Sequence, residues 1–451
     1  MNKRLQITPR KIAVDVLLRV EKGAYSHIAL KETFSAFSLT PLDRAFITEL
    51  VYGTIRRKNT LDFIISGFLK QSNLQDEIRC ILRMGVYQLR FMDRVPSSAA
   101  VNESVNLVDY YHLPGQKGFV NAVLRNIERN KDRDFFAAIQ DPIRRLALVT
   151  SHPSWIVEKM LSRFGQDDTE ALLDFNNRPS PNIVRVNSLK TNIEKLKLDL
   201  EAQNIQVSVL PIPGTLLLKG QSRFLNTEQY KQGHFMLQSP SSILAALMLQ
   251  PHAGLKILDA CAAPGGKSFV MAQEMNNQGA LLSSDVHEHK LNLLKKGFAH
   301  LGIDHAKAQF IDWTLEHKEW DGYFDRVLVD APCSGLGVLS KRADARWNKQ
   351  PKEISELVLL QKSILGHAAQ AVKKGGLLMY ATCTLTIEEN QAQREWFLST
   401  FPQFSPAALM DISGAFVDDA DSLARGELEI LPFKHNLEGF YMALFERGDR
   451  I

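Results

Sequence analysis

The sequence predicts a multidomain protein: an all-helical domain at residues 1–150, a small α+β module at 151–237 and an α/β domain at 238–451. Three observations support this. Apolar residues recur at helical spacing through the first part, and short β-type runs follow a Pro/Asn-rich break at 176–182. After Gly254, strand and helix patterns alternate, which is typical of a central, mostly parallel sheet. A chain of 451 residues also exceeds the usual size of one hydrophobic core.

In the first domain, helical spacing is clear at 12–20 and 46–55, and Thr40 with Asp43 predicts a helix N-terminus. Residues 1–150 hold 23 Lys/Arg and 15 Asp/Glu, a net charge of +8, whereas the remainder is at −4. Such a basic domain favours a polyanionic partner. A solvated basic surface is the plainer alternative. The candidate phosphate contacts are Arg56, Arg57, Lys58, Arg125 and Arg129.

The later elements are predicted from local pattern. The module should contain a helix at 155–164, a strand at 183–186 and a helix at 192–204. The α/β domain should contain strands at 256–258, 280–284, 308–311, 326–329 and 377–381, with helices at 268–275, 287–300 and 354–372. Gly375-Gly376 predicts a turn. An antiparallel pair at 428–431 and 439–445 should end the chain.

A glycine-rich turn follows the first strand of the α/β domain and comprises Cys261, Ala262, Ala263, Pro264, Gly265, Gly266 and Lys267. Its glycines let the backbone approach a ligand, and the amides of the next helix favour an anionic group. The turn matches neither the dinucleotide nor the P-loop pattern. Asp285 is placed to bind ribose hydroxyls and Asp312 an adenine amino group. This set predicts an S-adenosylmethionine site.

Two cysteines, Cys333 and Cys383, each follow a predicted buried strand. Cytosine C5 becomes nucleophilic only after a thiolate adds at C6, so a pyrimidine methyltransferase needs a cysteine. It also needs a carboxyl group in its protonated form near N3 and O2, and Asp330 could provide it. Either cysteine alone could instead be a buried small apolar residue. The spacing leaves open which of the two attacks.

Other classes are disfavoured. The four cysteines form no CxxC pair, so neither a metal site nor a disulfide framework is expected. The N-terminus lacks the apolar core of a signal peptide, and the apolar run at 243–249 is too short to cross a bilayer. We therefore expect a cytoplasmic monomer.

Together the motifs resemble the RNA 5-methylcytosine methyltransferases of the Nop2/Sun group, most closely the bacterial Sun/Fmu proteins that methylate small-subunit ribosomal RNA. The resemblance rests on CAAPGGK (261–267), DAPCSG (330–335), RW (346–347), KKGGLLMYATCT (373–384), EEN (388–390) and LEGFYMALFE (437–446). The segments at 43–57, 82–105 and 118–127 look like the NusB-like RNA-binding domain of those proteins.

The resemblance implies a Rossmann-like methyltransferase domain in which Cys383 attacks C6 and Cys333 assists release of the product. It also implies that Cys261–Lys267, Asp285, Asp312 and Asp330 hold S-adenosylmethionine, with Asp330 facing the base. Its implied substrate is a cytosine of 16S ribosomal RNA. The alternatives are a transfer RNA cytosine-C5 methyltransferase and a non-catalytic ribosome-assembly protein. Ser239, where relatives often have Asp, leaves one contact before the first strand open, and Ser340-Lys341 replaces a common Arg pair.

Overall fold

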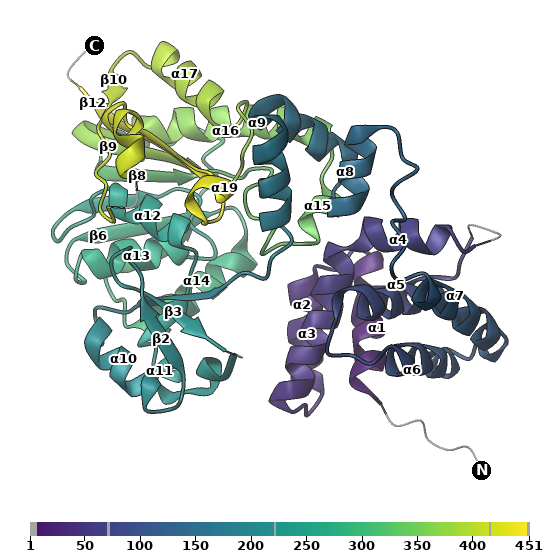
Figure 1. The fold of residues 1–451 in the computed structure, drawn as a ribbon. Coiled ribbons are helices and arrows are strands. Elements are labelled where there is room, and N and C mark those ends of the chain that lie inside the picture. Colours follow the sequence, from purple (N-terminus) through teal and green to yellow (C-terminus); the bar gives the residue numbers. More distant parts are fainter. Residues whose placement is uncertain (1–6, 70–72, 221, 415, 449–451) are drawn as a thin grey trace. The chain divides into compact units, whose positions relative to one another are not determined.

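The computed structural model describes residues 7–69, 73–220, 222–414 and 416–448 and consists of two compact units (Figure 1). Unit 1 contains the described residues up to Arg178 together with Arg342–Asn348, and unit 2 contains Pro179–Lys341 and the described chain from Lys349 onward. The N-terminal stretch on which the signal-peptide expectation rests, residues 1–6, lies outside the described residues. The α+β module does not form a third unit, because most of it clusters with the α/β domain.

Unit 1 is helical, as predicted. Its helices are α1 (Pro9–Glu21), α2 (Ser26–Ala36), α3 (Pro41–Arg56), α4 (Lys58–Ser66), α5 (Asp76–Phe91), α6 (Ser97–Tyr110), α7 (Lys117–Arg129), α8 (Pro142–Thr150), α9 (Ser154–Phe175) and the short α15 (Ala345–Asn348). Thr40 caps α3 by accepting a hydrogen bond from the Asp43 amide at 3.1 Å, as the sequence predicts. Leu50, Ile81 and Leu124, from α3, α5 and α7, are fully buried in one shared core.

Unit 2 begins with a small antiparallel sheet in the order β2-β3-β1-β4. Its elements are β1 (Asn182–Val186), α10 (Ile193–Glu201), β2 (Gln206–Val209), β3 (Thr215–Lys219), α11 (Glu228–Lys231) and β4 (Phe235–Leu237). Arg185 pairs with Glu274 at 2.5 Å, and the Asn187 side-chain amide donates to the Leu301 carbonyl at 2.8 Å. Because Glu274 and Leu301 belong to the α/β domain, these bonds attach the module to it.

The large sheet has the order β10-β12-β9-β8-β5-β6-β7, with β11 paired to β12. Its strands are β5 (Lys256–Asp259), β6 (Ala280–Asp285), β7 (Ala306–Phe310), β8 (Phe324–Asp330), β9 (Val372–Thr382), β10 (Phe404–Pro406), β11 (Glu427–Ile430) and β12 (Phe440–Arg447). The strands from β9 through β7 are parallel, and β12 runs antiparallel to β9. The carboxyl ends of β5, β6, β8 and β9 therefore lie at the same edge of the sheet.

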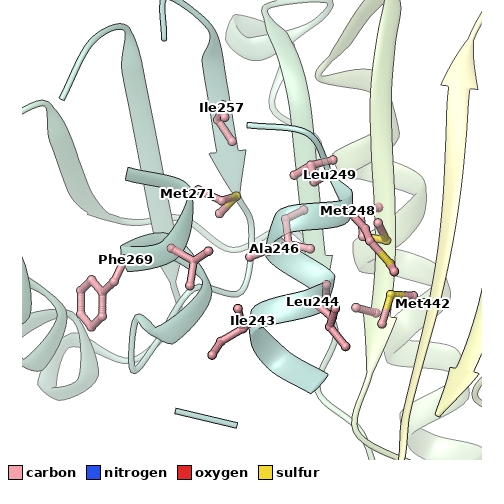
Figure 2. Packing of buried hydrophobic residues seen from close by; sticks show 14 of the residues in the cluster. Ile243, Leu244, Ala246, Met248, Leu249, Ile257, Phe269, Met271 and Met442 are labelled. Carbon is pink, nitrogen blue, oxygen red and sulfur yellow. The ribbon is translucent and has the colours of Figure 1, made fainter. Parts of the chain in front are cut away.

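Helices pack against both faces of this sheet. One core includes residues of α12 (Pro240–Met248), α13 (Gly266–Glu274) and α14 (Glu288–Leu301), and the other includes residues of α16 (Pro351–Gln370) and α17 (Gln391–Thr400). Successive residues of β9 alternate between them: Met379 lies in the first core and Tyr380 in the second. Figure 2 shows α12 packed beside α13, with Met271 and Met442 in the same apolar cluster.

The predicted strands and helices of the α/β domain are present, with end points shifted by a few residues. Gly375-Gly376 differs from the prediction, because it lies inside β9 rather than in a turn before it. Pairing with β8 passes from Phe324–Val372 directly to Arg326–Leu377, so extra β9 residues form a bulge. Gly375, at φ 73°, supplies the left-handed conformation there. Within the described residues, no helix is both long and apolar enough to cross a membrane.

Candidate active site

The turn between β5 and α13 is held by close packing. Gly265, at φ 113°, precedes α13, and a Cβ there would lie 2.5 Å from both Leu294 and Phe269. The Ala262 amide donates to the Ser284 carbonyl of β6 at 2.8 Å. The turn therefore keeps the N-terminal amides of α13 at the carboxyl edge of the sheet, where they can meet an anionic group.

Asp285 ends β6 and Asp312 follows β7, as the sequence predicts. Oδ1 of Asp285 accepts from the amide and ring Nδ1 of His287, and Oδ1 of Asp312 accepts from the amide and hydroxyl of Thr314. The Thr314 bonds lower the pKa of Asp312. Because these bonds use Oδ1, each carboxylate keeps Oδ2 available to a ligand. The two carboxylates therefore offer acceptor oxygens, and the amides of α13 offer donors, at the carboxyl edge of the sheet.

Asp259, the last residue of β5, lies behind this turn and is fully buried. Its Oδ2 accepts from the Ser268 hydroxyl at 2.6 Å, and its Oδ1 has no partner among the described residues. Burial raises the pKa of this carboxyl to about 7. The sequence analysis did not single it out, because an Asp at a strand end is usually a turn residue.

The structure brings Cys333 and Cys383 together beyond the tips of β8 and β9. Their Sγ atoms are 3.3 Å apart, and the Cys383 amide donates to the Cys333 sulfur at 3.4 Å. The hydrogen bond with Cys383, followed by burial, raises the pKa of the Cys333 thiol well above its ordinary value. The two sulfurs are therefore close enough to share one S–H···S hydrogen bond.

Asp330 ends β8 and pairs with Lys267 of the glycine-rich turn, with Nζ 2.6 Å from Oδ2. The Lys267 ammonium also lies 5.1 Å from the centre of the Phe440 ring. The predicted carboxyl group is therefore accompanied by an ammonium donor. The sequence placed Lys267 only in the cofactor turn, since its pairing depends on contact between residues 63 positions apart.

The EEN motif carried no assigned role in the sequence, yet it packs directly against the cysteine loops. The Thr382 hydroxyl donates to Asn390 Oδ1 at 2.6 Å, and Asn390 Nδ2 donates to the Thr384 carbonyl at 3.1 Å. Asn390 thus braces the residues on both sides of Cys383. Glu389 contacts the Cys333 loop as well.

The contact left open at Ser239 is made by Glu438. The Ser239 hydroxyl donates to Glu438 Oε2, and the Ser241 hydroxyl donates to the Glu438 carbonyl at 2.8 Å. Lys341, at the position of a common arginine, pairs with Glu438 Oε1 at 2.6 Å. A buried glutamate therefore supplies the carboxylate beside the two substituted positions.

The RW motif lies in unit 1. The Arg346 side chain is completely buried and donates to the carbonyls of Ser151 and Asn176, both at 3.0 Å. Trp347 Nε1 donates to the Ile55 carbonyl at 2.8 Å. Arg342–Asn348 is therefore an integral part of unit 1, although it follows the Cys333 loop by only a few residues.

The predicted phosphate contacts occupy different environments and are not brought together. Arg56 is buried, with 9% of its surface exposed, so it presents little surface to RNA. The Arg57 guanidinium lies 4.9 Å from the centre of the Phe91 ring, and Lys58 pairs with Glu21 at 2.9 Å. Arg125 pairs with Glu128 at 2.9 Å, whereas the side chain of Arg129 is exposed to solvent.

Comparison with known proteins agrees with this geometry. The family described as "16S rRNA methyltransferase RsmB/F" matches residues 246–446, the NusB family matches 7–129, and a ferredoxin-like domain of RsmF/B-like methyltransferases matches 152–223. The chain is 35% identical to a probable ribosomal RNA small subunit methyltransferase B of Bacillus subtilis, covering 96% of this chain and 97% of that protein. A protein of the same description from Synechocystis is 34% identical over 98% of this chain and all of that protein.

Solved structures share the fold. The crystal structure of PH0851 has a TM-score of 0.82 and 26% identity, and the match covers 99% of this chain and 100% of that chain. A methyltransferase homologue from Pyrococcus horikoshii has a TM-score of 0.59 and 24% identity, covering 68% and 99% of the two chains. The resemblance inferred from the motifs is confirmed. The chain belongs to the RsmB/F family of 16S ribosomal RNA methyltransferases and is an S-adenosylmethionine-dependent RNA methyltransferase.

Proposed function

We propose that this protein methylates C5 of a specific cytosine in 16S ribosomal RNA through a covalent bond between Cys383 and C6. The observation that carries the proposal is the pair of thiols, 3.3 Å apart, beside the Lys267–Asp330 ion pair. A module that only binds RNA needs neither thiol. The names of the bacterial relatives support the choice of small-subunit ribosomal RNA.

The paired thiols account for attack and for release. Cys383 as thiolate adds to C6, and the density that develops toward N3 and O2 is stabilised by hydrogen bonds donated by the Lys267 ammonium and by the protonated form of the Asp330 carboxyl. S-Adenosylmethionine, when bound, supplies an electrophilic methyl group for C5. A base then removes the C5 proton, and the bond between C6 and Cys383 breaks. In this scheme Cys333 is the protonated partner of the pair, and it stabilises the departing Cys383 sulfur by donating a hydrogen bond across the 3.3 Å contact.

Reaching the cytosine requires that the base leave its stack, because neither C5 nor C6 is accessible in folded RNA. The basic helical domain would supply phosphate contacts that set the register of the RNA. The same electrostatic attraction would act on transfer RNA, so the substrate has to be measured.

The test is covalent trapping on a denaturing gel. We expect Cys333→Ala to retain an RNA adduct that ribonuclease removes, because attack is intact and release is impaired. Cys383→Ala should form none. An adduct in Cys383→Ala but not in Cys333→Ala would reverse the roles, and no adduct in any variant would contradict the covalent route.

The substrate is tested by tritium-methyl transfer from labelled S-adenosylmethionine to 16S ribosomal RNA and, in parallel, to bulk transfer RNA. We expect label in the ribosomal RNA, recovered as 5-methylcytosine after digestion. Label in transfer RNA alone would overturn the proposed substrate. Absence of label in both would contradict catalysis at cytosine C5.

A further inference from the structure

One carboxylate, that of Glu389, contacts the loops of both cysteines. Glu389 Oε1 accepts from the Ser334 amide at 2.8 Å, and Oε2 accepts from the Ser334 hydroxyl at 2.6 Å. Ser334 immediately follows Cys333. Oε2 also accepts from the hydroxyls of Thr386 at 2.7 Å and Thr384 at 3.4 Å. Thr384 immediately follows Cys383, so the carboxylate joins the two loops next to their sulfur atoms.

The surroundings of Glu389 require a group that only accepts hydrogen bonds. Besides Ser334 and Thr386, the Gln361 side chain donates to Oε1 at 3.1 Å and also to the Pro332 carbonyl at 2.9 Å. The backbone amide of Ser334 cannot reverse its role, and an ionised carboxylate has acceptor sites for all these donors. A glutamine at 389 would turn an N–H group toward them.

Glu389 is also a buried charge with no counter-ion. Its side chain is completely buried, and it forms no ion pair with any Lys, Arg or His among the residues that the structure describes. Burying such a charge is costly unless several donors compensate it. A neutral side chain would fill the space with less penalty, so the charge itself points to a role in the site.

The charge acts on the Cys333 thiol. The negative charge of Glu389 contributes to the raised pKa of Cys333, after the contact with Cys383 and burial. It acts similarly on the pKa of Tyr380, whose hydroxyl donates to the Glu389 carbonyl at 2.7 Å. Glu389 therefore opposes ionisation of Cys333, the sulfur that lies against the proposed nucleophile.

We propose that Glu389 is a positioning residue for methyl transfer: its buried carboxylate fixes the Cys333 loop against the Cys383 loop and gives the two sulfurs different roles. This inference rests on the proposed function for its catalytic consequence. Glu389 does not touch the reacting atoms and acts through Ser334, Thr384 and Thr386.

The test is Glu389→Gln, which keeps the shape and removes the charge, against Glu395→Gln at an exposed position of α17. We expect Glu389→Gln to lower kcat for RNA methylation at least tenfold, with KM for RNA and the Kd for S-adenosylmethionine changed less than twofold. Glu395→Gln should match the wild type.

A second readout uses the protein without RNA. Iodoacetamide labelling at pH 8, quantified by mass spectrometry at each cysteine, should show a higher ratio of Cys333 to Cys383 labelling in Glu389→Gln, because a charge that opposes ionisation of Cys333 is gone. The ratio is also compared from pH 7 to pH 9, because removal of the charge moves the pH at which Cys333 labelling rises, whereas loosening of the loop does not. Wild-type kcat together with a wild-type ratio in a folded Glu389→Gln protein would overturn the proposal.

If Glu389→Gln does not fold, Thr386→Val removes one donor and leaves the charge in place. We then expect a several-fold lower kcat at unchanged Kd for S-adenosylmethionine, and an unchanged kcat would overturn the positioning role. If the wild-type protein methylates no cytosine, the proposed function fails, whereas the labelling ratio still decides whether Glu389 separates the two sulfurs.

Discussion

At the scale of single residues, the four cysteines show how environment decides whether a thiol is reactive. Burial raises the pKa of Cys80 to about 12 inside the helical core. Burial and three nearby aspartates also raise the pKa of Cys261, so its backbone is the useful part of the residue. Cys333 and Cys383 instead lie against each other. The sequence identifies these two by their strand-end motifs, but their contact requires the folded sheet.

Asp259 allows a prediction about pH, because its pKa is raised from 3.8 to about 7 in the folded protein. Between these values the folded state holds a proton that the unfolded state has released, so the stability contributed by Asp259 falls as pH rises. Asp259→Asn cannot ionise and should escape this loss. From pH 5 to pH 8, we expect the free energy of unfolding of cofactor-free Asp259→Asn to rise by about 2–3 kcal/mol relative to that of the wild type.

The measurement is urea unfolding of both proteins across that pH range, with hydrogen exchange in β5 to assign the change to unit 2. The Asn oxygen can still accept from Ser268, so the comparison isolates ionisation. A stability difference that stays constant with pH would show that Asp259 does not titrate in this window.

At the scale of elements, Arg342–Asn348 is a segment that local pattern could not assign. Its RW motif is visible in the sequence, but nothing in the spacing indicates that seven residues inside the α/β domain belong to the helical unit. The segment is held in unit 1 by contacts with residues far away in the sequence. Asp344 accepts from the Ser26 amide and hydroxyl, each at 3.0 Å, and Trp347 joins the helical core.

Arg346 should be the main anchor of this segment. Arg346→Met removes the donors of several buried oxygen atoms, among them the carbonyls of Ser151 and Asn176, so we expect unit 1 to lose about 3–5 kcal/mol of stability. Urea unfolding combined with hydrogen exchange in α9 would measure the loss. Arg342→Met, at an exposed position of the same segment, should change stability by less than about 0.5 kcal/mol. Equal effects of the two substitutions would contradict an anchoring role.

The bulge in β9 likewise could not be predicted from neighbouring residues alone. Two adjacent glycines indicate a turn when only neighbouring residues are considered. In the folded sheet, β8 lies alongside and pairs with residues on both sides of Gly375-Gly376, so the strand continues through them. Strand and helix types were predictable because apolar spacing is local, whereas register and pairing depend on partners far along the chain.

At the scale of the whole molecule, the order of the parts was predictable and their boundaries were less so. The matched families occupy 7–129, 152–223 and 246–446, in the order that the sequence texture indicates. The two compact units divide the chain differently. Most of the α+β module joins the α/β domain, because Arg185 and Asn187 bond to the helices of that domain. The motifs that carry the family resemblance were predictable because each is one continuous segment.

The net charge of +8 on residues 1–150 supports the last prediction, which concerns RNA binding. Because Arg56 is buried, neutralising it would disturb the core, so exposed Arg129 and Lys131 make a better test. Arg129→Gln with Lys131→Gln should weaken RNA binding and flatten the plot of log K against log salt by about 1.4, or about 0.7 per lost phosphate contact. The Kd for S-adenosylmethionine should not change. The matched control is Lys373→Gln with Lys374→Gln, exposed at the start of β9 and thus at the opposite end of that strand from Cys383. An equal change in slope in both pairs would mean that RNA responds to total charge, and an unchanged slope in the first pair would remove Arg129 and Lys131 from the interface.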